Sequence, residues 1–261
     1  MNGRSYPENF YPQFTKLQDD QARHEKAVKI ILALKMIRQN LDELRCLDIG
    51  CSSGVITSDV QPFFKFMVGI DYDIAGLRLI SDEQKAQTLF IRGDAMHLPF
   101  PKQSFDAIIC AQIYEHVPDG HNLFSEIERL IRPGGIVFFS GPNKLFPIEP
   151  HYFLPFIHWL PEKTADRYLQ LVKGKQYFDI KSRTFWELKK LMMAYDIFDM
   201  TLPVMRFFSN RHKSVMSKVE RLFLRMPSKL WRGLLPFIPN FNWVLIKLEN
   251  TNQYGKYYVM D

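Results

Sequence analysis

The sequence predicts an α/β fold: a mostly parallel sheet of seven strands, with an antiparallel last strand and helices on both faces. Short apolar runs alternate with segments of about ten residues that have helical periodicity. This alternation is typical of parallel strands joined by right-handed helical crossovers. The 261 residues are 46% hydrophobic and 24% charged, which is an ordinary globular composition. Disorder and coiled coil are therefore excluded, and we expect one domain.

The first predicted element is an amphipathic helix at 20–40, where apolar residues recur every three or four positions. Strands are predicted at 45–50, 66–71, 88–92, 105–111, 136–140, 197–202 and 243–248. Helices are predicted between them at 54–63, 75–83, 123–131 and 184–193. A Pro-Gly-Gly turn ends the helix at 123–131, because neither residue type continues a helix well. The last two strands form the antiparallel edge of the predicted sheet.

The chain is divided by composition within its single domain, 1–261. We expect an N-terminal arm and helix at 1–43, a cofactor-binding core at 44–141, an aromatic substrate lid at 142–180 and a basic amphipathic insertion at 203–240. No apolar run of 18 residues occurs, and residues 1–20 lack the pattern of a signal peptide. The three cysteines form no CxxC pair, which favours a reducing compartment. These features predict a cytoplasmic protein.

The most informative segment follows the first predicted strand. It reads Asp48-Ile49-Gly50-Cys51-Ser52-Ser53-Gly54, a D-x-G-x-x-x-G pattern that leads into a helix. Gly50 and Gly54 let the backbone approach a ligand that a Cβ atom would block. The dinucleotide pattern G-x-G-x-x-G is absent, and Asp48 would repel a pyrophosphate. The loop therefore favours a cationic or zwitterionic ligand beyond the strand ends.

Carboxylates also follow the next two strands. Asp71 ends the second strand, where it can accept both hydroxyls of a ribose. Asp94 follows the third, where it can meet the exocyclic amine of an adenine. Each aspartate alone is as well explained as a helix N-cap. Their occurrence together with the glycine loop favours a cofactor site.

These motifs resemble those of class I S-adenosylmethionine-dependent methyltransferases of the type-11 (UbiE/UbiG-like) group. The resemblance rests on LDIGCSSG, GID, GDAMHLPF, FDAIICAQIYEHV and LIRPGGIVFFSGPN, and it is close over 44–143. It implies a Rossmann-like fold and S-adenosyl-L-methionine as the cofactor.

The resemblance also assigns roles to individual residues. Asp48, Gly50 and Gly54 would line the methionine part, and Asp71 would bind the ribose. Asp94 and Ala95 would hold the adenine edge, and Gln112 would lie beside the sulfonium. Ser52 stands where the family usually has a glycine, for which we expect a modest effect.

Two histidines are candidates for the general base that such a transfer to a hydroxyl needs. His116 follows the fourth strand, and His151 lies in the predicted lid. His116 is equally well explained as an ordinary loop histidine. The other histidines show no metal-ligand spacing, so the sequence predicts no metal site.

The acceptor must be inferred from the segments around the core. Residues 145–161 are rich in proline and aromatic residues, which favours an apolar lid over an ordinary loop with a small core of its own. Segment 203–240 carries eight Lys and Arg against one Glu, so the rest of the chain sums to −1. An apolar stripe within it runs over Val215, Met216, Val219, Leu222, Phe223 and Met226.

Such a helix either lies on an anionic membrane or packs on the domain with a solvated basic face. We expect a small or amphiphilic acceptor, such as a quinone precursor or a lipid-linked glycan, methylated at oxygen. The protein would then touch the inner membrane face peripherally.

Two other functions remain as alternatives. The net charge of +6 suggests nucleic acid, but residues 111–114 lack the Asn/Asp-Pro-Pro-aromatic motif of amino-directed base methyltransferases. A nucleic-acid partner is thus not favoured, although RNA (tRNA) methylation at a ribose hydroxyl needs no such motif. The second alternative is a non-catalytic, S-adenosylmethionine-binding regulatory protein.

Overall fold

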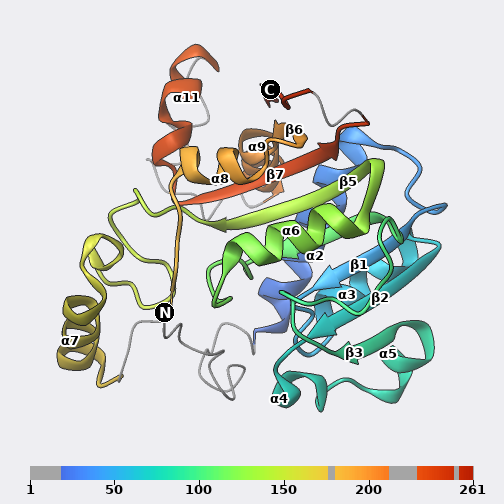
Figure 1. Cartoon of the computed structure of the whole chain (residues 1–261), viewed down its shortest axis with the longest axis horizontal. Coiled ribbons are helices and arrows are strands. Elements are labelled where there is room, and N and C mark those ends of the chain that lie inside the picture. The colour runs from blue at the N-terminus through green and yellow to red at the C-terminus, as the bar shows by residue number, and fades with distance from the viewer. Residues whose placement is uncertain (1–18, 176–179, 212–227, 250–252, 261) are drawn as a thin grey trace.

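The computed structural model describes residues 19–175, 180–211, 228–249 and 253–260, and the strands of this part form one mixed sheet (Figure 1). The strands are β1 Arg45–Ile49, β2 Phe66–Asp71, β3 Leu89–Arg92, β4 Phe105–Ala111, β5 Ile131–Pro142, β6 Tyr195–Asp199, β7 Asn240–Lys247 and β8 Tyr257–Val259. Their order is β3-β2-β1-β4-β5-β7-β6-β8. Strands β1 to β5 pair in parallel, and β7 runs antiparallel to β5 and β6. The parallel sheet and its antiparallel edge are confirmed.

The sheet has eight strands rather than the predicted seven. The additional strand β8 has three residues and pairs in parallel with β6. Its residue Tyr257 donates a hydrogen bond to the buried carboxylate of Asp199, which also accepts from Trp243 Nε1 at 2.8 Å. A strand of three residues shows no periodicity in the sequence, and its partner Asp199 is 58 residues away along the chain. The sequence therefore could not predict this strand.

The helices are α2 Asp20–Ile37, α3 Val55–Val60, α4 Ile74–Leu77, α5 Asp82–Gln87, α6 Gly120–Leu130, α7 Glu162–Lys173, α8 Phe185–Leu191, α9 Thr201–Arg211 and α11 Ser228–Leu234. Two predictions are corrected. The helix at 75–83 is two helices, because Ser81 starts α5 with a capping box to Gln84. The strand at 197–202 ends at Asp199, because its carboxylate accepts a hydrogen bond from Thr201 N at 2.8 Å and α9 begins there.

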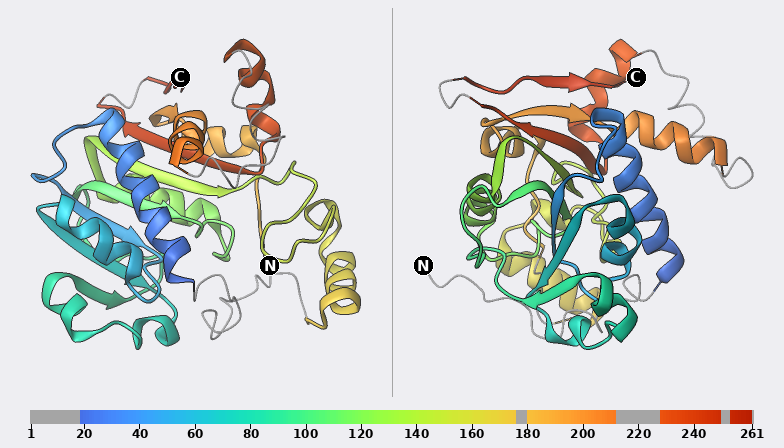
Figure 2. Two further views of the ribbon diagram at one scale, coloured as in Figure 1. Left: turned by 180° about the vertical axis from the view of Figure 1, so that it is seen from behind. Right: turned by 90° about the vertical axis from the view of Figure 1, so that its right-hand side faces the viewer.

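Both faces of the sheet are covered by helices, as Figure 2 shows in its right-hand view, where α2 and α6 lie on opposite sides. The strands alternate accordingly. Ile108 and Cys110 of β4 pack in the core beneath α6 and α8, whereas Ala107 and Ile109 pack beneath α2, α3 and α9. Because both faces are buried, the central strands are mostly apolar, and their charged residues Arg45, Asp48 and Asp106 lie near the strand ends.

The predicted lid begins after β5 and contains α7. Its apolar residues form a small core of their own: Tyr152, Leu154, Ile157, Ala165, Leu169 and Ile180. The segment is therefore packed on itself, and part of it also lines the cavity described below.

The basic insertion is only partly described. Helices α9 and α11 flank residues 212–227, and the apolar stripe from Val215 to Met226 lies outside the described residues. None of the helices in the described ranges is long and apolar enough to cross a membrane.

Candidate functional site

A cavity of about 670 Å³ opens at the carboxyl ends of β1, β2 and β4. This is the edge where ligands of open α/β sheets bind. Eight of the predicted site residues line it: Asp48, Gly50, Ser52, Asp71, Ala95, Gln112, His116 and His151. Gly54 and Asp94 are not among the lining residues. The structure thus brings six of the eight predicted cofactor residues and both candidate bases to one cavity.

Asp48 at the end of β1 is nearly fully buried, with 4% of its surface exposed. Thr57 of α3 donates a hydrogen bond to its carboxylate at 2.6 Å. The pKa of Asp48 is raised to about 6, mainly because burial disfavours the ionised carboxylate and because Asp71 is a nearby negative charge. The hydrogen bond from Thr57 and the positive charge of Arg23 lower the pKa and so oppose this shift. An ionised Asp48 is therefore costly in the free protein, and a cationic group in the cavity would relieve that cost.

Asp71 holds the glycine loop in place from β2. Its carboxylate accepts hydrogen bonds from the backbone of Ser52 at 2.7 Å and of Asp73 at 2.8 Å. Burial raises the pKa of Asp71, while these backbone hydrogen bonds lower it. Ser52 has φ +52°, in the left-handed region that favours glycine, which explains why a glycine is usual there.

Gly50 is required by packing. It has φ +82°, and a Cβ atom built on it would lie 2.3 Å from Ile113 Cδ1. Any larger residue would therefore have to displace the Ile113 side chain and would also be strained at this φ.

Gly54 and Asp94 do not line the cavity, and the contacts that they make are within the fold. Gly54 precedes α3 with φ +72°, and a Cβ atom there would lie 3.0 Å from the Phe90 ring. Asp94 accepts a hydrogen bond from Met96 N at 2.8 Å and so caps a turn; no helix follows it in the described residues before β4, so the alternative of a helix N-cap is wrong. Its neighbours Gly93 and Ala95 do line the cavity. The adenine contact of Asp94 stays a prediction.

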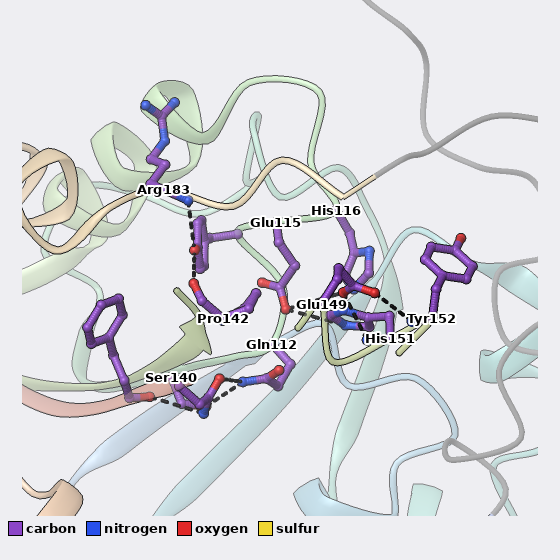
Figure 3. A network of polar contacts seen from close by, with 12 residues as sticks. Gln112, Glu115, His116, Ser140, Pro142, Glu149, His151, Tyr152 and Arg183 are labelled. Carbon is purple, nitrogen blue, oxygen red and sulfur yellow. Dashed lines mark hydrogen bonds and ion pairs between the residues drawn. The ribbon is translucent and has the colours of Figure 1, made fainter. Parts of the chain in front are cut away.

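Gln112 lies just beyond β4 in a strained conformation, with φ +58°. Its side-chain amide donates to Asn240 Oδ1 at 2.9 Å and contacts Ser140 Oγ at 3.4 Å (Figure 3). Its backbone N–H donates to Ser140 O at 2.8 Å. Strands β5 and β7 therefore hold this side chain at the cavity wall.

The two candidate bases lie together with two glutamates (Figure 3). The rings of His116 and His151 are 5.0 Å apart. Glu115 Oε1 lies 3.9 Å from His116 Nε2 and 3.8 Å from His151 Nε2. His151 Nδ1 is hydrogen-bonded to Glu149 Oε1 at 2.6 Å. The lid thereby meets the loop after β4 in a buried polar cluster.

Burial dominates the ionisation of this cluster. It raises the pKa of Glu115 to about 7, against the attraction of His151. It lowers the pKa of His116 well below the ordinary value, and His151 lowers it further. Burial would also raise the pKa of Glu149, but His151 and two backbone hydrogen bonds hold it below its usual value.

Three residues at the site were not predicted: Arg23, Glu115 and Glu149. Arg23 lies 3% exposed in α2, lines the cavity and donates a hydrogen bond to Ser53 Oγ. Its helical spacing from Ala27 and Ile30 places it on the apolar face of α2, which was a usable signal. Glu115 precedes His116 in the motif FDAIICAQIYEHV, but no role was assigned to it. Glu149 lies in an aperiodic segment that gave no signal.

Comparison with known proteins is consistent with this geometry. Residues 47–139 match the family model described as a methyltransferase domain. The ubiquinone biosynthesis O-methyltransferase of Histophilus somni is 31% identical over 114 residues, covering 41% of this chain and 48% of that protein. The protein of the same name from Coxiella burnetii is 31% identical over 151 residues, covering 55% and 64%. The matched part of the chain thus spans 48% and 64% of the length of these two relatives.

Solved structures share the fold at low sequence identity. An S-adenosylmethionine-dependent methyltransferase from Mesorhizobium loti matches with a TM-score of 0.56 at 16% identity, covering 85% of this chain and all of that one (100%). A phosphoethanolamine N-methyltransferase from Haemonchus contortus matches with a TM-score of 0.57 at 12% identity, covering 92% and 45%. Residues 47–139 therefore match a methyltransferase domain, and the structure shows a Rossmann-like sheet with a cavity at the carboxyl ends of its strands.

Proposed function

We propose that the protein transfers a methyl group from S-adenosylmethionine to a hydroxyl oxygen of an amphiphilic acceptor, such as a quinone precursor or a lipid-linked glycan. One observation carries the proposal. A single cavity is lined both by the predicted cofactor residues, including Asp48 and Asp71, and by His116 and His151. A methyltransferase needs this combination, because donor and acceptor must be held in contact away from water.

The residues present fit the cofactor. Asp48 gives the cavity a buried carboxylate that suits the ammonium group of the methionine part. Asp71 lines the same cavity, and its carboxylate suits the ribose hydroxyls. Gly93 and Ala95 also line the cavity, and such small residues leave room for the adenine. The cavity volume of about 670 Å³ lies within the usual range for small-molecule sites.

The cofactor supplies a methyl group already activated by its sulfonium. The protein must orient the acceptor, exclude water and activate the acceptor hydroxyl. His116 and His151 line the cavity next to the buried Glu115, so they are the residues placed to act on that hydroxyl. They stay the predicted catalytic residues.

The rest of the lining supports an amphiphilic acceptor. Ile113, Val117, Tyr152 and Phe153 provide apolar walls. Four lysines also line the cavity: Lys26, Lys29, Lys173 and Lys175. Apolar walls together with several cations favour an acceptor that joins an apolar part to an anionic group.

We also propose peripheral contact with an anionic membrane. The lid exposes large apolar side chains: Phe153 at 60%, Phe156 at 51%, Trp159 at 49%, Leu171 at 80% and Val172 at 52%. Phe153 also lines the cavity, so an acceptor could enter from a lipid surface. Flotation with anionic vesicles tests the contact. Changing Leu171 and Val172 together to Ser should reduce flotation, whereas Leu79→Ser, remote from the lid, should not; equal flotation of all three proteins contradicts the proposal.

The function is tested by incubating the purified protein with methyl-labelled S-adenosylmethionine and separated lipid, glycan and RNA fractions. We expect label in the lipid or lipid-linked glycan fraction. His151→Ala should lower the rate by about 10²–10⁴-fold with unchanged cofactor affinity, and His121→Ala, an exposed histidine of α6, should change neither. Label in RNA would favour the tRNA alternative. Cofactor binding without any labelled product would favour a regulatory protein.

A further inference from the structure

The polar cluster at the cavity has the composition of a metal centre. We propose that Glu115, His116 and His151 bind one divalent transition-metal ion of the zinc class, which coordinates the acceptor hydroxyl. The role toward the acceptor rests on the proposed function; the binding of the ion does not. Spacing along the sequence predicted no metal site, because the two histidines come from different segments that only the fold brings together.

The ligand atoms are close enough to share one ion. One ligand atom from each of the three residues lies within 4.8 Å of the others, with separations of 3.9 Å and 3.8 Å from Glu115 Oε1 to the two imidazoles. Tetrahedral zinc with bonds of about 2.0–2.1 Å holds its ligands about 3.4 Å apart. The two separations from Glu115 Oε1 would therefore each have to shorten by about half an ångström.

Glu115 supplies the second observation. Its side chain is fully buried, at 0% exposure, and neither carboxylate oxygen has a hydrogen-bond partner among the described residues. A buried carboxylate without donors is strongly disfavoured unless a cation or a proton accompanies it. Both nearby imidazoles present Nε2 toward Oε1 of this carboxylate. A divalent cation between them would compensate the buried charge of Glu115.

Glu149 acts as the supporting residue that metal-binding histidines usually have. It accepts from His151 Nδ1 at 2.6 Å, which leaves His151 Nε2 directed at Glu115 (Figure 3). The backbone N–H of His151 also donates to Glu149 Oε1 at 2.8 Å, so this carboxylate orients both the backbone and the ring of His151. Glu149 is thus a positioning residue, and the ion would tie the lid to the loop after β4.

Three protein ligands leave at least one coordination position open, as in catalytic zinc sites. His116 and His151 line the cavity, so that position faces the bound acceptor. A coordinated hydroxyl has a lowered pKa and releases its proton to water at the cavity mouth. The O–CH₃ bond then forms as the S–CH₃ bond breaks, and the metal keeps its oxidation state. The imidazoles activate the hydroxyl through the ion in this scheme.

Cobalt(II) provides the test, because its visible absorption reports coordination by nitrogen and oxygen without any need for activity. The full chain is stripped with a chelator, dialysed and titrated with Co²⁺, and Zn²⁺ is then added in competition. We expect one Co²⁺ per chain with a low-coordinate absorption band that Zn²⁺ abolishes. His151→Ala and Glu115→Gln should remove the band, and Glu149→Gln should weaken binding by about 10–100-fold.

His121→Ala is the matched control and should bind Co²⁺ as the wild type does. If Glu115→Gln fails to fold, His151→Ala decides the matter, because His151 lies in the lid. Absence of stoichiometric uptake, or uptake unchanged in His151→Ala, overturns the metal site. Methyl transfer that continues at full rate in excess chelator overturns the catalytic role of the ion and leaves the proposed function standing. Metal uptake without any methyl transfer overturns the proposed function and leaves the metal site standing.

Discussion

Asp48 should make the free protein less stable at neutral pH than an uncharged side chain would. Burial raises its pKa from 3.8 to about 6. A shift of about two units corresponds to about 3 kcal/mol between the two protonation states. Because the folded pKa lies above the unfolded one, the stability contributed by this group is complete below pH 3.8 and is lost as the pH rises through about 6.

Asp48→Asn removes the charge and keeps an oxygen that can accept the hydrogen bond from Thr57. Without cofactor, the variant should gain about 1–3 kcal/mol in the free energy of unfolding at pH 7.5. The gain should shrink to about a third of that value at pH 4.5 and vanish only below pH 3.8. Urea unfolding at both pH values measures the free energy of unfolding. The control is Asp42→Asn at an exposed position, which should leave this free energy unchanged at both pH values.

The same substitution should weaken S-adenosylmethionine binding about 10–100-fold, because a charge-assisted hydrogen bond is worth about 1.5–3 kcal/mol. Calorimetric titration measures this loss. A variant that is less stable than the wild type at both pH values refutes the electrostatic reasoning. A variant that binds the cofactor with unchanged affinity refutes the assigned role of Asp48.

Three further predictions follow from the site and its support. In the wild type, affinity for S-adenosylmethionine should fall as the pH drops below about 6, where Asp48 takes up a proton, and calorimetry between pH 5 and 8 should show no such fall in Asp48→Asn. Gly50→Ala should lose cofactor binding and about 1–2 kcal/mol or more of stability, since its Cβ would lie 2.3 Å from Ile113; wild-type binding and melting temperature would contradict this. Tyr257→Phe should lower the free energy of unfolding by about 1–2 kcal/mol in urea because Asp199 loses a donor, with cofactor affinity unchanged; an equally stable variant would show that β8 adds nothing to the sheet.

The parallel core could be predicted from the sequence because its signals are local. The strand at Phe66–Asp71 and the strand at Phe105–Ala111 each read as apolar runs between turn residues, and the structure has them at those bounds. Asp48 and Asp71 could be placed at one cavity because parallel strands end at the same edge. The position of each carboxylate then followed from the order of the strands.

The remaining features depend on contacts between distant segments. Strand β8 pairs with β6, and its Tyr257 donates a hydrogen bond to Asp199; a pattern of three residues cannot predict either contact. Glu149 enters the site because the lid carries His151 back over the loop after β4. Asp94 was predicted either to cap a helix or to contact the adenine, and its hydrogen bond from Met96 N at 2.8 Å depends on the turn that the folded chain makes there.

The central claim is that one cavity holds S-adenosylmethionine with its methyl group directed toward the residues that act on the acceptor. A crystal structure of the protein with S-adenosylhomocysteine tests it most directly. The account predicts the ligand in the cavity beyond β1 and β2, with its amino group toward Asp48, its ribose at Asp71 and its sulfur on the side of Gln112 and His151. An empty cavity at saturating ligand, or the ligand bound elsewhere, would contradict it.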